Sequence, residues 1–232
     1  MKILQINSHY NQGGAARIVA CIHRQLLADG VDSHVAYGRG TKVEETGVHM
    51  FGSRLGVYMS AFLSRFIGLN GYFNHHATRK LLRLIDEIQP DIIHMHVLHG
   101  YYLNVPMLFH YINEHHIPCV WTFHDCHAFV GNCGYYLDCR KWEKGCECCP
   151  YLKKYPTSQW FDHTRKMWLE KRELFTQGDR KIVVAPSDWL KKEAEKSFLS
   201  KYECRTIHNG IDTKNTFYPR KQDECRKKYG YL

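Results

Sequence analysis

The sequence predicts an α/β fold built on a doubly wound parallel sheet. Apolar runs typical of strands alternate at least five times with amphipathic runs typical of helices along the 232 residues. The strand runs are apolar throughout, which indicates burial between two layers of helices. With 44% hydrophobic residues, the chain is long enough to bury a substantial core.

The first part of the chain predicts an opening strand-helix-strand unit. A strand is expected at 2–8, a glycine-containing turn at 9–17, a helix at 18–30 and a second strand at 31–38. Ile18, Cys21, Ile22 and Leu26 recur at helical spacing, and Gly30 is a typical helix stop. A short strand is expected at 48–52 and an apolar helix within 53–69.

The alternation continues to the end of the chain. Helices are expected at 79–90, 105–116, 159–178 and 187–199, the last with Ser187 as its N-cap. Strands are expected at 91–97, 117–125 and 181–187, and a final strand and turn at 204–212. No internal repeat interrupts this order.

The formal net charge of +9 and the isoelectric point near 9.0 predict a surface that attracts anions. Nucleic acid, sugar nucleotides and anionic lipid headgroups are all compatible with this charge. The Lys and Arg residues are scattered rather than dense, which argues against a dedicated nucleic-acid surface. The N-terminus lacks the long apolar region of a signal peptide, and no segment is apolar enough to span a bilayer. We therefore expect a cytoplasmic protein that is at most peripheral to a membrane.

The stretch from His124 to Pro156 is the least regular part of the sequence and contains six of the ten cysteines. Its aromatic content argues against disorder, and a loop of this length in a compact domain is usually functional. In a reducing compartment, clustered thiols favour metal ligation or burial over disulfides. We expect a structural zinc site, with buried free thiols as the main alternative and disulfides third. The expected ligands are Cys133, Cys139, Cys146 and Cys149.

The turn after the first strand contains Gly13, Gly14 and Ala15. Small residues there let the backbone approach a ligand, and the following helix presents free N–H groups to an anion. The segment is not a dinucleotide fingerprint, because it lacks the GxGxxG pattern and no acidic residue closes the second strand. A tight turn without a ligand is the alternative interpretation.

Histidines gather near the ends of two expected strands. His94 and His96 are two residues apart and share one face of a strand, where they are metal ligands, substrate contacts or satisfied core residues. His99 follows at the edge of that strand. His124 and Asp125 close the next strand, where an imidazole donates to a sugar hydroxyl or a phosphate and a carboxylate fixes its tautomer. An ordinary polar pair at a strand end is the alternative.

The apolar helix expected within 53–69 is flanked by Arg54 and Arg65 and contains Tyr58, Phe62 and Phe66. Such a helix rests in the interface of a bilayer. Packing on its own core or on a protein partner is the competing interpretation.

Five segments in order resemble the N-terminal half of glycosyltransferase family 4, the retaining GT-B enzymes of bacterial surface polysaccharide synthesis. They span 2–17, 91–104, 121–156, 183–190 and 207–219, and the Cys-rich stretch resembles the colanic-acid and capsule branch. The resemblance implies a Rossmann-like, acceptor-side domain at 1–207, followed at 208–232 by the crossover and the truncated start of a donor domain. The rest of the donor domain is expected to be missing from this chain, so we expect little transfer by the chain alone.

The resemblance also implies the site and the reaction. The implied reaction moves a hexose from a nucleotide-sugar donor onto a growing, lipid-linked glycan at the inner face of the cytoplasmic membrane, without nucleic acid and without a required cofactor. A non-catalytic module that binds a glycan or a partner is the alternative. His124 and Asp125 match the catalytic position, and His127 stands where this branch usually has Trp. The residues expected to contact donor or acceptor are Gly13, Gly14, Ala15, Arg17, His96, His99, Asn104, His127 and Asn209.

Overall fold

The computed structural model describes residues 1–214, 217–219 and 222–230 and contains one seven-stranded parallel sheet. Its order is β3-β2-β1-β4-β5-β6-β7. The strands are β1 Lys2–Asn7, β2 Asp32–Tyr37, β3 Val48–Met50, β4 Ile92–Met95, β5 Cys119–Thr122, β6 Lys181–Ala185 and β7 Cys204–Thr206. The α-helices are α1 Gly14–Ala28, α2 Arg54–Ile67, α3 His75–Ile88, α4 Val105–Glu114, α5 Thr164–Phe175, α6 Asp188–Glu195 and α7 Gln222–Tyr229. Two 3₁₀ turns are η1 Lys141–Glu143 and η2 Phe198–Lys201.

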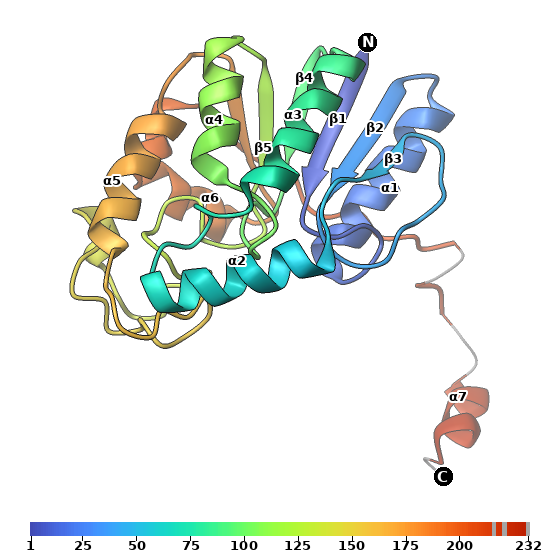
Figure 1. The fold of residues 1–232 in the computed structure, drawn as a ribbon. Coiled ribbons are helices and arrows are strands. Elements are labelled where there is room, and N and C mark those ends of the chain that lie inside the picture. Colours follow the sequence, from blue (N-terminus) through green and yellow to red (C-terminus); the bar gives the residue numbers. More distant parts are fainter. Residues whose placement is uncertain (215–216, 220–221, 231–232) are drawn as a thin grey trace.

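The chain moves outward from β1 in two directions, which makes the sheet doubly wound. It goes first to β2 and β3 and then crosses back to β4 on the other side of β1. Right-handed crossovers in opposite directions place helices on opposite faces, and Figure 1 shows α1 on one face and α3 and α4 on the other. The Rossmann-like α/β fold predicted from the sequence is confirmed. The direction changes between β1 and β4, where sheets of this kind bind ligands at the carboxyl ends of the strands.

The core lies on both faces of the sheet, and its centre is apolar on the face that α3 and α4 cover. Leu4 and Ile6 of β1 pack beside Ile93 and Met95 of β4, and all four side chains are buried. Aromatic rings extend the core beyond β5. The ring pairs are Phe109–Trp121, Phe109–Phe175 and Trp121–Phe123.

Several element boundaries differ from the sequence prediction, and α3, for example, begins at His75 rather than residue 79. Helix α1 begins at Gly14 rather than Ile18, because the turn is completed at Gly13 and small residues continue the helix from there. Helix α5 begins at Thr164 rather than residue 159, since Asp162 accepts hydrogen bonds from the backbone and hydroxyl of Thr164. Strand β7 ends at Thr206. The helix α7 was not predicted, and Asn215 and Thr216 of the expected crossover lie outside the described residues.

Helix α2 lies across the carboxyl ends of the strands, below the sheet in Figure 1. Ser53 caps its first turn by accepting from the amide of Gly56, and Gly68 ends it in the left-handed conformation. The apolar helix predicted within 53–69 is therefore present. Within the described ranges, no helix has the length and apolar character needed to cross a bilayer.

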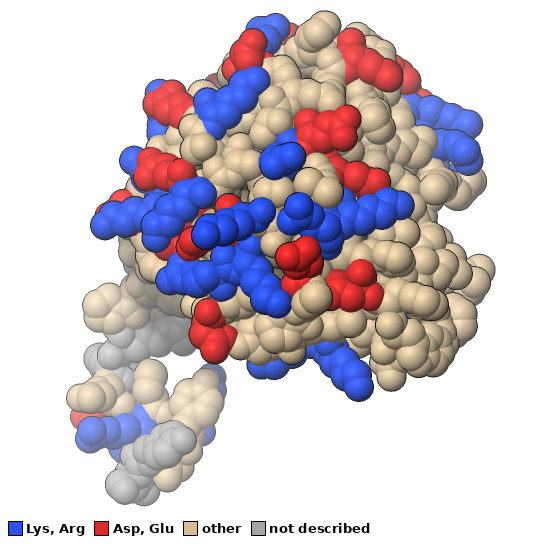
Figure 2. Space-filling view, turned by 90° about the vertical axis from the view of Figure 1, so that its left-hand side faces the viewer, with Lys and Arg blue, Asp and Glu red and all other residues tan. Residues whose placement is uncertain are grey.

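Basic side chains dominate part of the surface. Figure 2 views the molecule from the side on which α5 lies in Figure 1 and shows Lys and Arg side chains gathered across the middle of that face, with Asp and Glu among them. The excess of positive charge counted in the sequence is thus mixed with acidic groups on this face. The net positive charge favours the approach of anions, although this face is not uniformly positive.

Candidate functional site

The carboxyl edge of the sheet collects most of the residues that the sequence singled out. Because all the strands are parallel, the residues that follow them emerge at one edge. Gly13 follows β1, His96 follows β4, His124 follows β5 and Asn209 follows β7. β1, β4 and β5 are consecutive in the sheet, so the histidines lie next to each other at its centre.

The rings of His96 and His124 form a hydrogen-bonded relay that starts at Gln5. The amide of Gln5 donates to the carbonyl of Val19, so its Oε1 accepts from His96 Nε2, 3.2 Å away. A neutral His96 that donates from Nε2 has a bare Nδ1, and this atom lies 3.1 Å from His124 Nε2. His124 therefore donates through Nε2 and keeps its Nδ1 free of a proton.

Burial keeps this relay neutral. It lowers the pKa of His96 well below the ordinary 6.5, with the charges of His94 and His124 adding to the effect. The pKa of His124 is also lowered by burial, although the charge of Asp125 opposes the shift. His94 packs on His96 with ring centroids 4.1 Å apart and bonds Thr122 through Nε2, and burial lowers its pKa to about 4. Uncharged rings can accept or donate a hydrogen bond to a sugar at neutral pH.

Asp125 organises the residues around the relay. Its Oδ2 accepts from His99 Nε2 at 2.6 Å, and its Oδ1 accepts from the backbone N–H of His127 at 2.8 Å. Burial by itself raises the pKa of Asp125, but the hydrogen bonds and charge of these neighbours outweigh it, so the pKa lies below its ordinary value. Asp125 is ionised and fixes both His99 and the start of the Cys-rich stretch.

His127 supports the loop from inside. Its Nδ1 donates to the carbonyl of Asn132 at 2.9 Å, and its ring lies 4.8 Å from that of His99. Lys171 of α5 approaches its Nε2 at 3.3 Å and donates to the carbonyls of His127 and Val130. Burial lowers the pKa of His127 well below 6.5 and that of Lys171 to about 8. Lys171 was not singled out from the sequence, because a lysine in a highly charged helix is typical of an exposed position.

The glycine turn leaves the N-terminus of α1 open. Gly13 has a φ of 89°, and a Cβ built on Gly13 or Gly14 would meet no atom within 4 Å. No side chain caps the N-terminus of α1, so its first amides are available to an anion. Ala15 is half-buried and Arg17 is exposed in the same first turn.

A cleft of about 400 Å³ beside this turn was not predicted. Its walls include His9, Arg39, Arg54 and Tyr58, which come from the ends of β1 and β2 and from α2. Two guanidinium groups suit an anionic ligand. The signal in the sequence was the position of Arg39, between two glycines directly after an expected strand. The structure shows why the first of these is glycine: a Cβ at Gly38 would overlap the Tyr102 ring, so the turn must stay narrow.

Two predicted contact residues lie apart from the relay. Asn104 caps α4 by accepting from the amide of Met107, and it donates to the carbonyl of Tyr72. Asn209 is exposed beyond β7, which lies two strand spacings, or about 10 Å, from β5 and its His124. Among the contacts of the described residues, none joins Asn104 or Asn209 to His96 or His124.

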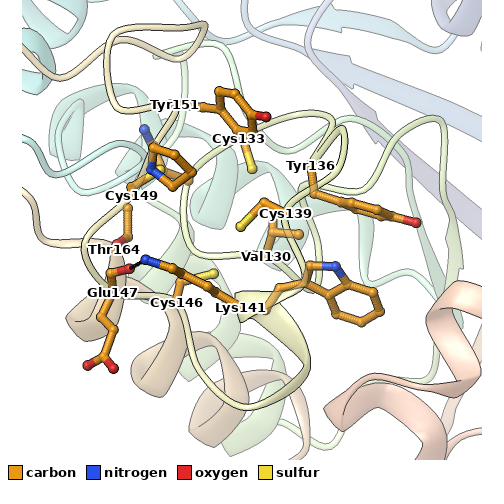
Figure 3. Close-up of a pocket in the computed structure, with 13 residues that line it drawn as sticks. Val130, Cys133, Tyr136, Cys139, Lys141, Cys146, Glu147, Cys149, Tyr151 and Thr164 are labelled. Carbon is orange, nitrogen blue, oxygen red and sulfur yellow. Dashed lines mark hydrogen bonds between the residues drawn. The ribbon is translucent and has the colours of Figure 1, made fainter.

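The four cysteines expected to bind zinc line one small cavity. Figure 3 shows Cys133, Cys139, Cys146 and Cys149 around a space of about 20 Å³. All ten cysteines are free thiols, and burial raises the pKa of Cys133 to about 12 and of Cys146 to about 11. As the side chains stand, the described residues contain no group of three or more His, Cys, Asp or Glu that could hold a metal ion. Zinc at this cavity remains a prediction.

Comparison with known proteins identifies the family. A sequence profile described as Glycosyltransferase Family 4 matches residues 12–215. The chain belongs to this family. The match includes the glycine turn, the histidine relay and the whole Cys-rich stretch.

A relative of this family 4 chain occurs in Escherichia coli (strain K12), where it is provisionally named colanic acid biosynthesis glycosyl transferase WcaC. The two are 31% identical over 233 residues. The alignment covers 91% of this chain and 55% of WcaC, so the chain spans about half the length of the relative it matches.

Solved structures with a similar arrangement are more distant. The catalytic domain of starch synthase IV from Arabidopsis thaliana, bound to ADP and acarbose, is 14% identical with a TM-score of 0.49, covering 91% of this chain and 52% of that one. UGT71G1 of Medicago truncatula, complexed with UDP-glucose, is 9% identical with a TM-score of 0.49, covering 98% and 56%. Membership of family 4 rests on the sequence profile and not on these structures.

Proposed function

We propose that this chain forms the acceptor side of a retaining glycosyltransferase that moves a hexose from a sugar nucleotide to a growing, lipid-linked glycan of a surface polysaccharide. The observation that carries the proposal is the neutral His124 with a bare Nδ1 at the carboxyl edge of a family 4 sheet. The surface-polysaccharide context is taken from the name of the relative WcaC.

In this proposal the donor diphosphate lies at the N-terminus of α1. The open space before Gly14 and the unpaired amides of the first turn suit phosphate oxygens. Arg17 is exposed in the same turn and adds positive charge. The nucleotide diphosphate is the leaving group, so charge stabilisation here acts on the group whose negative charge grows during transfer.

His124 receives the sugar. Its Nδ1 accepts a hydrogen bond from a hydroxyl of the hexose, while Nε2 donates to His96 and fixes the tautomer. Asp125 is a positioning residue, because both of its oxygens are already engaged by His99 and the amide of His127. Orientation of the sugar by fixed polar groups lowers the entropic part of the barrier.

The acceptor enters along α2. The cleft with Arg39 and Arg54 suits the phosphate of a lipid-linked glycan, and the exposed apolar side of α2 continues from it. This places the lipid part of the acceptor toward the surface of the cytoplasmic membrane, where the chain binds peripherally.

A transfer assay tests the proposal. The purified protein is combined with a polypeptide that supplies the donor-binding half and is incubated with labelled sugar nucleotides and membranes that carry lipid-linked oligosaccharide, and label in the organic extract is counted. We expect His124→Ala to lower transfer by about 100-fold or more, whereas His110→Ala, an exposed histidine of α4, leaves the rate unchanged. Full activity of the His124 variant would contradict the assignment. Saturable glycan binding without transfer by the unmutated protein would instead favour a non-catalytic binding module.

A further inference from the structure

Four thiols of the Cys-rich stretch share one cavity of atomic size. Cys133, Cys139, Cys146 and Cys149 are separated by up to sixteen positions in the sequence, yet all four line a cavity of about 20 Å³. This volume accommodates one water-sized atom. In Figure 3 the sulfur atoms of Cys133, Cys139 and Cys146 point toward this common space. The other thiols of the stretch, Cys126 and Cys148, are not among the lining residues.

One sulfur of the cavity, that of Cys146, accepts a hydrogen bond from the backbone. The N–H of Gly131 donates to Cys146 Sγ at 3.1 Å. A Cβ at Gly131 would lie 2.8 Å from the Cys146 Cβ and 2.7 Å from the carbonyl oxygen of Thr164, so this approach requires glycine. Outer hydrogen bonds of this kind orient metal ligands and stabilise the charge on thiolate sulfur.

A buried cation lies next to the same thiols. Lys171 is 7% exposed, and its ammonium donates to the carbonyls of His127 and Val130. Within the described part of the chain, no carboxylate lies within ion-pair distance of it. Cys146 and Cys133 lie near Lys171, and the ionised carboxylate of Asp125 is a further neighbour. Thiolates held by a metal at this cavity would add to the negative charge around the buried ammonium.

From the shared cavity and the backbone amide bonded to sulfur, we propose that the Cys-rich stretch binds one structural zinc ion. The four thiols lose their protons to solvent and bind Zn²⁺ through four zinc–sulfur bonds of about 2.3 Å. The cluster then carries a double negative charge, which Lys171 offsets in part. The cysteine side chains must rotate toward the cavity to close the site, because they do not stand at ligating distance in the present arrangement.

This inference does not depend on the proposed transfer reaction. The zinc lies in the loop and holds it against α5, and no step of sugar transfer passes through it. Structural zinc contributes folding free energy directly, so its removal releases the loop.

Metal analysis tests the proposal. Protein purified without chelators is expected to contain about one zinc per chain, and X-ray absorption is expected to show a first shell of sulfur only. Cys133→Ser and Cys146→Ser are expected to lose at least half of this zinc. Cys148→Ser is the matched control, since this exposed thiol belongs to the same stretch but not to the cavity.

A second measurement covers variants that do not fold. In the unmutated protein, a thiol-specific mercurial is expected to release zinc to a colorimetric indicator, and chelator treatment is expected to make bonds within 133–156 cleavable by protease. A zinc content near zero in the folded protein purified without chelators would overturn the proposal. So would unchanged zinc in the soluble Cys133 and Cys146 variants.

Discussion

At the scale of single residues, the decisive feature is the protonation of one imidazole. His124 exposes its bare Nδ1 because His96 accepts from its Nε2, and His96 is fixed in turn by Gln5. Gln5 is completely buried on β1 and does not reach the edge of the sheet. Gln5 therefore sets the hydrogen-bonding capacity of His124, the residue proposed to bind the sugar.

Substitution of Gln5 tests this relay. Gln5→Met removes the acceptor for His96 Nε2 while keeping the size of the side chain. The His124 tautomer is then no longer fixed, and we expect transfer to fall about 10-fold or more. Nitrogen NMR of histidine-labelled protein checks the cause, since the His124 signals are expected to change from an Nε2-protonated ring to a mixture. Gln5→Asn, which retains an amide, is the conservative comparison. An unchanged tautomer in Gln5→Met would argue against the relay.

Acid is expected to destabilise the protein through His94. The folded protein holds the pKa of His94 at about 4, against about 6.5 in the unfolded chain. Between these pH values the unfolded chain binds a proton that the folded protein does not, so this stability is complete above pH 6.5 and is lost as the pH falls toward 4. The loss is about 3 kcal/mol.

Urea unfolding at several pH values checks this expectation. His94→Gln cannot be protonated but still bonds the hydroxyl of Thr122, so its stability is expected to fall less steeply between pH 6.5 and 4.5. Carboxylates contribute equally to both proteins and cancel in the comparison. Parallel curves for the two proteins would show that His94 is not the titrating group.

At the scale of elements, the Cys-rich stretch behaves as part of the core. Trp142 of η1 is 1% exposed and packs against Phe129 and Tyr136. Its carbonyl accepts from Trp168 of α5 at 2.9 Å, and Tyr136 donates to Glu193 of α6 at 2.6 Å. The loop is therefore anchored to two helices, so it holds His127 and Asp125 in place.

Removal of the central indole tests this anchoring. Trp142→Ala is expected to cost about 3–5 kcal/mol because it leaves a large cavity among aromatic rings. Trp160→Ala removes an indole that is 63% exposed and should change the stability little. Thermal unfolding gives the magnitude, and limited proteolysis is expected to cut first within 133–156. Equal stability of the two variants would mean that the loop is not part of the core.

Helix α2 is expected to bind membranes. Its exposed apolar side chains continue onto the loop through the contact of Phe66 with Trp160, 4.7 Å between ring centroids. Leu55→Ser combined with Phe62→Ser is expected to lower binding to anionic vesicles about 10-fold or more. Leu27→Ser on α1 is the control, because this side chain is also exposed but lies on another helix. Salt should weaken the binding of the unmutated protein. Identical binding of the double variant and the control would exclude α2 as the contact. The exposed large hydrophobic side chains of α2 are Leu55, Tyr58, Met59, Phe62 and Ile67.

At the scale of the whole molecule, the sequence predicted what local periodicity controls. Strand-helix alternation predicted the parallel sheet, and the period of two placed His94 and His96 on one face, as the 4.1 Å between their ring centroids confirms. The relay to His124 was not predicted, because it requires β4 and β5 to be neighbours, and no local pattern specifies strand order. Family resemblance supplied the position of His124, which periodicity alone leaves as a polar residue at a strand end.

Burial of polar residues was the part that the sequence did not reveal. Lys171 lies in a helix rich in Lys, Arg and Glu and looks exposed by composition, but the Cys-rich stretch covers it. Arg39 was missed because its importance depends on the cleft formed with α2, which is distant in sequence. In both cases a loop or helix from elsewhere determines the environment of the side chain.

The central claim is that a sugar binds at His124 on the carboxyl edge of the sheet. It is tested most directly by titrating histidine-labelled protein with sugar nucleotides and acceptor glycan while following the imidazole signals by NMR. The account predicts saturable shifts at His124 and His99, with His110 on α4 unaffected. Saturable binding of these ligands that leaves the His124 signals unchanged would contradict it.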